Sequence, residues 1–218
     1  MASSRSVAVI GLGTFGGAVA TALSRFGDHV LGIDADEGVV ARHADRLTRA
    51  VIADARELRA VEEAGLGSYD VAVICMATDI EANLLAVMNA REAGVPVVWA
   101  KATTATHARI LERVGVDRIL RPEEVYGELL AQVLHNPLVR GSVKLTDDLH
   151  LAQIEAPPRL CGRQIGRIRF AERHDLRCLG LLRGVVPLPP DPEEELAPGD
   201  TLLLVGTRPA MRAFADKG

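Results

Sequence analysis

Apolar residues in the first half of the chain alternate between short continuous runs and helical spacings. A run at 7–10 leads directly into a glycine-rich segment, after which Val19, Ala22, Leu23 and Phe26 recur on one helical face. Continuous apolar runs are typical of strands that a parallel sheet buries on both faces. The pattern therefore predicts a strand, a tight turn and a helix near the beginning of the chain.

The same alternation continues as far as Pro122. Further strands are expected at 29–33, 50–53, 69–75, 97–100 and 118–120. Helices are expected at 37–46, 56–64, 80–93 and 106–114. Asp36 and Asp79 are the expected N-caps of two of these helices, and glycines at 65, 94 and 115 stand where helices end. Alternating strands and helices predict an α/β fold with a Rossmann-like, doubly wound parallel sheet.

The pattern changes after Pro122. An amphipathic helix is expected at 123–134, ended by Pro137, with residues 140–142 as a linker. A smaller α+β unit follows, with strands expected at 149–155, 177–182 and 201–205. Its helices are expected at 165–173 and 209–215, and its loop at 187–198 is acidic and rich in proline. The chain is thus expected to form two domains, 1–138 and 139–218.

Composition narrows the class of protein. Of 218 residues, 48% are hydrophobic and 25% charged, which is typical of a soluble globular protein. No run approaches the ~20 apolar residues of a membrane span, and a net charge of −4 gives no reason to expect nucleic acid binding. Cys75, Cys161 and Cys178 lack metal-ligand spacing and are expected to be reduced thiols.

An alternative interpretation of the first residues is a secretory signal. Arg5 precedes the apolar residues 7–22, and Ala18-Val19-Ala20 stands near their end. Cleavage there would delete the first strand and helix of the predicted sheet, so we expect the segment to remain.

The glycine-rich segment matches the pattern G-x-G-x-x-G through Gly11, Gly13 and Gly16. In this context the first glycine permits a tight turn and the second lets a diphosphate approach the backbone. The third lets the helix pack closely on the strand. The helix N-terminus then offers free N–H groups to phosphate oxygens. An ordinary strand–helix turn is the alternative.

Asp34 ends the second predicted strand, about 20 residues after the glycine pattern, where a ribose-binding acid is expected. A carboxylate there can accept hydrogen bonds from both ribose hydroxyl groups and repels a 2′-phosphate. The sequence therefore favours NAD-type or adenine mononucleotide ligands over NADP.

Several segments resemble the RCK family, which combines TrkA-N and TrkA-C domains. They are 11–17 (GLGTFGG), the acids Asp34 and Asp36, 53–55 (ADA), 98–102 (VWAKA) and 115–123 (GVDRILRPE). The last is the most specific, because such a string has no role in generic dehydrogenases. From about Leu145 to the GDTLLLVG of 199–206, the chain resembles TrkA-C. The resemblance points to the KtrA/TrkA group of gating subunits.

The resemblance implies regulation of bacterial potassium uptake without catalysis. In this family the first domain binds ATP, ADP or NAD(H), and the bound nucleotide changes the shape of the assembly and so gates a channel. The subunits form dimers and often octameric rings. They lie in the cytoplasm against the inner face of the membrane, held there by a KtrB/TrkH-like potassium channel subunit. No nucleic acid polymer is implied as a partner.

The resemblance also implies which residues bind the nucleotide. They are Gly11, Gly13, Thr14, Phe15, Gly16, Asp34, Asp36, Asp54, Ala55, Ala77, Thr78 and Lys101. Asp54 matches the residue beside adenine and Lys101 a lysine that faces the phosphates. Glu123 matches an acid that helps to hold Mg²⁺ or another divalent cation against ATP at a dimer interface. Each also has a local alternative: Asp54 as a helix cap, Lys101 as a surface lysine and Glu123 as a first-turn acid.

Thr14 departs from the family pattern, because related chains often carry arginine there to contact a γ-phosphate from a neighbouring subunit. A hydroxyl contributes less than a bidentate arginine, so discrimination of ATP from ADP is expected to weaken.

The second domain suggests a second anionic ligand, since some relatives bind cyclic di-AMP there. Five arginines surround the helix expected at 165–173, namely Arg163, Arg167, Arg169, Arg173 and Arg177. A solvated basic face, balanced by Glu172 and Asp175, is the alternative interpretation.

Two other functions fit the sequence less well. An NAD-dependent oxidoreductase would need an acid–base constellation, and no Tyr-x-x-x-Lys or His–Asp pair stands beside the expected nicotinamide position. A redox-sensing transcription factor would need a basic helix-turn-helix, for which there is no room before Val7. The expected function remains a nucleotide-binding regulatory subunit.

Overall fold

The computed structural model describes residues 5–76, 78–135, 138–146 and 148–215, and gives only the backbone of residue 132. Residue contacts divide the chain into two units, Met1–Glu123 and Glu124–Gly218. This division falls inside a helix, α6 (Pro122–His135), whereas the sequence placed a domain boundary near residue 138. The expected boundary stays a prediction, and each unit is described by itself.

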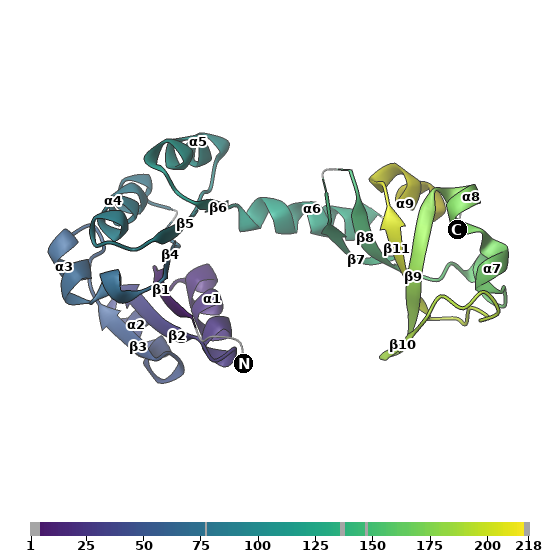
Figure 1. Ribbon diagram of the computed structural model, residues 1–218, viewed down its shortest axis with the longest axis horizontal. Coiled ribbons are helices and arrows are strands. Elements are labelled where there is room, and N and C mark those ends of the chain that lie inside the picture. Colours follow the sequence, from purple (N-terminus) through teal and green to yellow (C-terminus); the bar gives the residue numbers. More distant parts are fainter. Residues whose placement is uncertain (1–4, 77, 136–137, 147, 216–218) are drawn as a thin grey trace. The chain divides into compact units, whose positions relative to one another are not determined.

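The first unit is built on a six-stranded parallel sheet with the order β3-β2-β1-β4-β5-β6 (Figure 1). Its strands are β1 (Ser6–Ile10), β2 (His29–Asp34), β3 (Arg49–Ile52), β4 (Val71–Ile74), β5 (Val97–Lys101) and β6 (Arg118–Leu120). Strand order reverses between β1 and β4, which is the doubly wound topology that the alternation predicted. The carboxyl ends of all six strands therefore meet at one edge.

Helices cover both faces of this sheet. They are α1 (Thr14–Arg25), α2 (Glu37–His43), α3 (Leu58–Glu63), α4 (Ile80–Glu92) and α5 (Ala105–Val114). Successive side chains of a strand point to opposite faces, so Ala8 and Ile10 pack with α3, α4 and α5, while Val7 and Val9 pack with α1 and α2. Figure 1 shows α4 and α5 on one side of the sheet and α1 on the other. Burial on both faces explains why the strands are continuously apolar.

The predicted aspartate caps and glycine stops are confirmed, whereas α3 begins at Leu58 and not at residue 56. The Asp36 carboxylate accepts a hydrogen bond from Val39 N at 2.8 Å, and that of Asp79 accepts one from Ala82 N at 3.0 Å. Gly65, Gly94 and Gly115 have φ angles of +76°, +92° and +87°. Glycine adopts these left-handed angles without the steric penalty of a Cβ atom, which ends each helix at that point.

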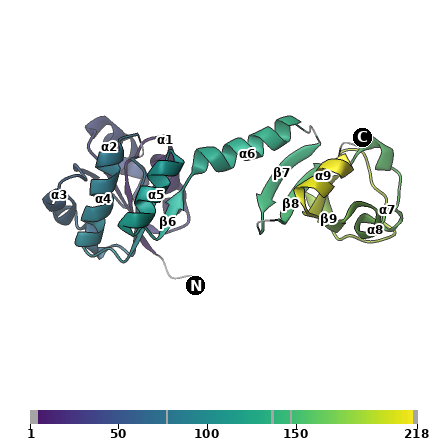
Figure 2. The same cartoon turned by 90° about the horizontal axis from the view of Figure 1, so that it is seen from above.

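The second unit is built on a five-stranded antiparallel sheet with the order β10-β9-β11-β8-β7 (Figure 1). Figure 2 shows β7 beside β8 in this sheet. Its strands are β7 (Val139–Lys144), β8 (His150–Glu155), β9 (Leu176–Arg183), β10 (Val186–Leu188) and β11 (Thr201–Gly206). Alternate residues of β8 and β11 are buried, so one face of the sheet forms the core. Helices α7 (Ile165–Ile168), α8 (Phe170–His174) and α9 (Arg208–Ala215) complete that core, in which Phe214 is fully buried.

Three expectations for this unit were wrong. The loop expected at 187–198 begins later, because residues 187 and 188 belong to β10, which pairs with β9. Residues 140–142 are not a linker but part of β7, which pairs with β8 through Ser142 and Ala152. Glycine and serine are typical of linkers, and the strand that pairs with them, β8, lies beyond a turn. The local sequence therefore does not indicate the pairing. The helix expected at 165–173 is two helices, because Arg169 between them has φ = +55°. The break lets Ile165, Ile168 and Phe170 all reach the core.

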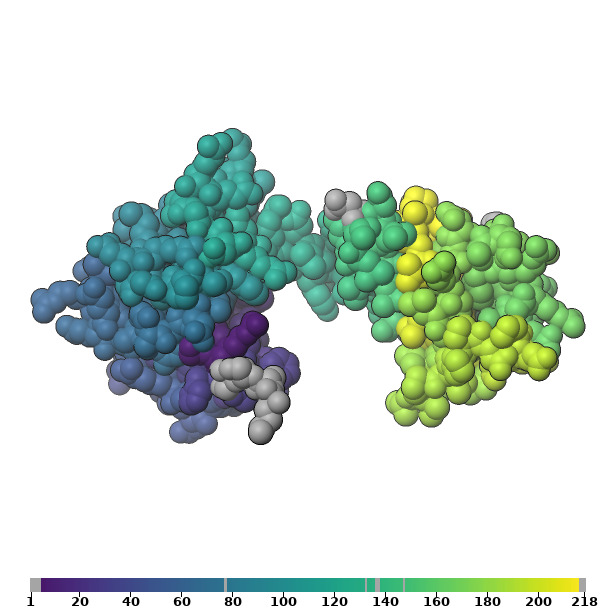
Figure 3. Space-filling view, viewed as in Figure 1, coloured from purple at the N-terminus to yellow at the C-terminus, as the bar shows by residue number. Residues whose placement is uncertain are grey.

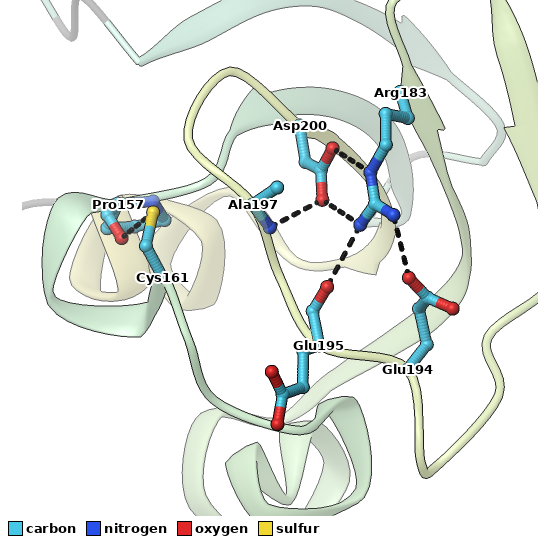
Figure 4. Close-up of polar contacts among 7 residues, drawn as sticks. All are labelled: Pro157, Cys161, Arg183, Glu194, Glu195, Ala197 and Asp200. Atoms are coloured by element: carbon cyan, nitrogen blue, oxygen red, sulfur yellow. Dashed lines mark hydrogen bonds and ion pairs between the residues drawn. The ribbon is translucent and has the colours of Figure 1, made fainter.

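The acidic loop after β10 is held by one buried carboxylate, that of Asp200, which is only 1% exposed (Figure 4). Its two oxygens accept hydrogen bonds from Arg183 Nε at 3.0 Å, Arg183 Nη2 at 2.9 Å and Ala197 N at 2.8 Å. Arg183 also bonds the Glu194 carboxylate and the Glu195 carbonyl oxygen. The hydrogen bonds from Arg183 hold the pKa of Asp200 below its usual value. This yellow-green loop lies on the surface in Figure 3.

Among the described helices, none has both the length and the apolar character that crossing a bilayer requires.

Candidate functional site

The expected nucleotide-binding residues lie at the carboxyl edge of the parallel sheet. Gly11 to Gly16 follow β1, and Asp34 and Asp36 stand at the end of β2 and just after it. Asp54 and Ala55 follow β3, Thr78 follows β4, and Lys101 is the last residue of β5. The structure therefore brings residues from five separate segments to one edge, where open α/β sheets bind their ligands. Ala77 lies outside the described residues.

At two positions of the loop, only glycine fits without strain. Gly11 has φ = +87°, and its N–H donates to Ile33 O at 2.8 Å. A Cβ atom on Gly16 would lie 1.9 Å from the Gly11 carbonyl oxygen, so no larger residue fits there without rearrangement. At Gly13, by contrast, an added Cβ would meet no atom within 4 Å. Gly13 faces open space, which fits the role of admitting a ligand to the backbone.

The N-terminus of α1 is left open. Gly13 is its N-cap and supplies no side-chain hydrogen bond, and no acid stands in the first turn. Helix α3 likewise lacks a side-chain cap, whereas α2, α4 and α5 are capped by Asp36, Asp79 and Thr104. Free N–H groups and the positive end of a helix dipole favour a phosphate at such a place.

Asp34 connects two of these loops. Its half-buried carboxylate accepts hydrogen bonds from Leu12 N at 2.7 Å and from Asp36 N at 3.0 Å, one to each oxygen. Each carboxylate oxygen has a second lone pair, so both can still accept from a ribose hydroxyl group. Asp36 itself caps α2, so its carboxylate already has a structural role.

Asp54 lies beyond β3 and forms a close ion pair. Arg56 Nε lies 3.0 Å from both of its oxygens, and Nη2 lies 2.6 Å from Oδ2. These hydrogen bonds lower the pKa of Asp54. The neighbouring Ala55 is buried, and its carbonyl oxygen accepts from Asn89 Nδ2 at 2.9 Å.

Lys101 is the cation of the site. Its side chain is only 12% exposed, it forms an ion pair with Glu123, and its ammonium group lies 5.3 Å from the centre of the Phe15 ring. The hydrogen bond from Lys101 lowers the pKa of Glu123. The partly buried Cys75 thiol lies close by, and burial raises its pKa to about 12, so it stays protonated near neutral pH. Lys101 is thus a positioned cation beside the glycine loop and not a freely solvated surface lysine.

Glu123 can hold a divalent cation only with help from a ligand. The described residues contain no cluster of three or more side chains suited to binding a metal ion. One carboxylate together with phosphate oxygens is nevertheless a common arrangement for Mg²⁺. The exposed Glu123 fits that arrangement, and its metal role stays a prediction.

Two buried polar residues behind the edge were not expected. Asn83 on α4 and His107 on α5 are both fully buried, and they contact one another. The signal was present in the sequence as a polar residue on the apolar face of each helix. Their partners lie 7 to 24 residues away in the chain, which no local pattern specifies.

The five arginines in and around α7 and α8 are all exposed. Arg163 and Arg167, together with Gly162, Gln164 and Glu195, line a cavity of 360 Å³. Glu195 places a negative charge in that cavity, so it is less basic than the sequence suggested.

Comparison with known proteins identifies both parts of the chain. The TrkA-N domain family matches residues 7–122 and the TrkA-C domain family residues 149–217, which confirms the resemblance drawn from the sequence. The chain is 30% identical to the Ktr system potassium uptake protein A of Bacillus subtilis (strain 168), over 98% of this chain and 97% of that protein. It is 32% identical to the protein of the same name from Vibrio alginolyticus, over 93% and 92%.

The fold is also that of a solved channel structure. The GsuK channel bound to NAD superposes with a TM-score of 0.67 at 13% identity, over 97% of this chain but only 39% of that chain. At this identity the likeness shows the fold alone. It confirms the doubly wound sheet followed by a smaller unit.

Proposed function

The chain belongs to the family defined by the TrkA-N and TrkA-C domains, and on that premise we propose that it is a nucleotide-binding regulatory subunit of a potassium-uptake system. It acts through a change of conformation, carries out no reaction of its own, and works at the cytoplasmic face of a membrane-embedded potassium channel subunit. Two Ktr potassium uptake proteins, related over nearly their whole length, support the proposal.

One observation carries the binding part of the proposal. The uncapped N-terminus of α1, the open Gly13 and the Asp34 carboxylate lie together at the edge where β1 and β4 diverge. That arrangement suits a diphosphate next to a ribose, as in ADP, ATP or NAD(H). A 2′-phosphate would meet the Asp34 charge, which disfavours NADP.

The Lys101–Glu123 pair supplies a route from ligand to helix. A phosphate group that reaches Lys101 competes with Glu123, which lies in the first turn of α6. Release of Glu123 frees a carboxylate for a divalent cation or for a neighbouring subunit. A ligand can shift such an equilibrium only by its different affinities for the two states, so the pair is where nucleotides that differ in phosphate number would act differently.

The decisive experiment is calorimetric titration of the full chain with ATP, ADP, NADH and cyclic di-AMP, each with and without Mg²⁺, alongside light scattering. We expect an adenine nucleotide to bind below millimolar concentration to an oligomer, with NADH recovered unchanged. Cyclic di-AMP tests the cavity near Arg163 separately. Failure of every adenine nucleotide to bind would contradict the proposal.

Asp34→Ala identifies the site. We expect it to weaken nucleotide binding by about 100-fold or more, because the ribose loses a charged acceptor and the Leu12 N–H loses its partner. Unchanged affinity in this variant would show that Asp34 does not bind the nucleotide, which would then bind elsewhere.

A further inference from the structure

Helix α4 carries a carboxamide inside the core of the first unit. Asn83 is fully buried, and its neighbours on the same face of the helix, Ala82, Ala86 and Val87, are apolar. Burying an amide is unfavourable unless its hydrogen-bonding groups find partners. The partners of Asn83 therefore show what the residue holds in place.

Asn83 bridges the two strands whose ends border the site. Its Nδ2 group donates to Met76 O at 3.0 Å and to Lys101 O at 3.3 Å. β4 and β5 pair as far as Ile74 and Ala100, and the two carbonyl groups lie just beyond that pairing. The carboxamide thus replaces the strand-to-strand hydrogen bonds at the point where the chains diverge.

His107 fixes the orientation of that carboxamide. Because Nδ2 must face the two carbonyl oxygens, Oδ1 faces His107 Nε2 at 3.3 Å, and Nε2 must therefore carry the proton. The other ring nitrogen, Nδ1, is buried and has no hydrogen-bond partner among the described residues. Burial lowers the pKa of His107, so the ring is neutral near pH 7.

Both carbonyl groups belong to segments that shape the candidate site. The Met76 backbone N lies 3.1 Å from where a Cβ on Gly11 would be, so a shift of Met76 would press on the glycine loop. The Lys101 side chain contacts the Phe15 ring and Glu123. A displacement at either carbonyl would therefore reach the phosphate-facing groups directly.

We propose that Asn83 and His107 are a buried pair of positioning residues for the nucleotide site. Asn83 sets the course of the backbone at Met76 and Lys101, and His107 keeps the carboxamide in the orientation that does so. Neither side chain reaches the ligand. This inference rests on the proposed function, because it assigns a role within the same site.

The test measures ADP affinity and thermal unfolding of the full chain in four variants. Asn83→Leu keeps the size of the side chain and removes both donors, and we expect it to weaken ADP binding by about tenfold or more. His107→Gln keeps a donor for Asn83 and should stay within about threefold of the unchanged chain, whereas His107→Leu should lose about as much as Asn83→Leu. Val87→Ala, on the same helix and fully buried, is the matched control for lost stability and should leave ADP affinity unchanged.

The outcomes separate this inference from the function on which it rests. If the unchanged chain binds no adenine nucleotide, the proposed function fails and this inference with it. If the unchanged chain binds ADP and Asn83→Leu binds it equally well, only this inference is overturned. It is also overturned if Val87→Ala loses as much affinity, or if His107→Gln behaves like His107→Leu. Should Asn83→Leu not fold, the imidazole ¹⁵N shifts of the unchanged chain decide, since a proton on Nδ1 contradicts the pair.

Discussion

Both units of the chain contain buried polar residues, and two of the hydrogen-bond networks that they form are built differently. In the second unit, Asp200 and Arg183 form a charged network in which Asp200 receives three hydrogen bonds. In the first unit, Asn83 and His107 form a neutral one, and a buried ring nitrogen has no partner among the described residues. The charged network holds an acidic loop of its own unit. The neutral one holds the backbone at the edge where the candidate ligand binds.

The difference shows how a polar core can serve either stability or a site. The buried Asp200 carboxylate is satisfied by three hydrogen bonds, so we expect the loss of its charge to be felt chiefly in unfolding. The neutral amide of Asn83 donates fewer hydrogen bonds, but these set the course of the backbone where β4 and β5 diverge. We therefore expect the two networks to respond to substitution in different measurements, stability for one and nucleotide affinity for the other.

Asp200→Asn should give the largest effect on stability. The neutral amide forms no ion pair with Arg183. We therefore expect the free energy of unfolding to fall by about 2 kcal/mol. ADP affinity should not change. Chemical denaturation and calorimetric titration measure the two quantities. Glu193→Gln, which removes an exposed carboxylate from the same loop, is the control and should change neither. A loss of ADP affinity in Asp200→Asn would break the distinction between the networks.

The same pair predicts an acid dependence. The pKa of Asp200 is lowered in the folded chain, so its contribution to stability is present above the ordinary aspartate pKa, about 4. That contribution is lost as the pH falls through the lowered folded value. The difference in unfolding free energy between the unchanged chain and Asp200→Asn should therefore be constant from pH 7 to about pH 5 and shrink below pH 4. A difference that stays constant down to pH 2 would contradict the role given to this carboxylate.

Asn89→Leu should give a smaller change in nucleotide affinity. Asn89 lies on α4, like Asn83, but donates to one carbonyl group only, that of Ala55 beside Asp54. We expect ADP to bind about threefold more weakly, as measured by titration. An effect larger than that of Asn83→Leu would place the controlling contact at β3 and not between β4 and β5.

Glu123→Gln should change nucleotide affinity by no more than Asn89→Leu does, and the sign of its effect depends on magnesium. Without Mg²⁺, Glu123 competes with phosphate for Lys101, so its removal should tighten ADP binding by about threefold. With Mg²⁺, binding of ATP should weaken if Glu123 helps to hold the cation. Glu112→Gln makes the same change of charge at an exposed position on α5 and is the control. Weaker ADP binding without Mg²⁺ would show that the two side chains do not compete.

Much of the first unit could be predicted because its signals are local. Gly65, Gly94 and Gly115 end helices where the sequence placed them, and Asp36 and Asp79 begin them. The doubly wound parallel sheet followed from the alternation of strands and helices, since few connections suit a parallel sheet. In the second unit, β7 was missed because Ser142 becomes a strand residue only through pairing with Ala152. Such pairing depends on a partner strand, and the residue types of the segment alone do not indicate it.

The candidate site divides in the same way. The glycine pattern and Asp34 were visible because their spacing in sequence is regular. The ion pair of Lys101 with Glu123 was not, although both residues were expected near the ligand. Asn83 and His107 were missed altogether, because a buried polar residue is defined by its partners. The partners of Asn83 come from the segment after β4, from β5 and from α5, which meet only in the folded chain.

The close approach of Met76 to Gly11 has a consequence for the order of events during synthesis. The glycine motif leaves the ribosome early, but its shape depends on β4, which pairs with β1 and begins only at Val71. The long segment between β1 and β4 must close into a loop before these two strands can pair. A nascent chain that has exposed its first sixty residues therefore carries the complete motif without a formed pocket. The nucleotide binding proposed above can stabilise the fold only after the middle of the first unit has emerged.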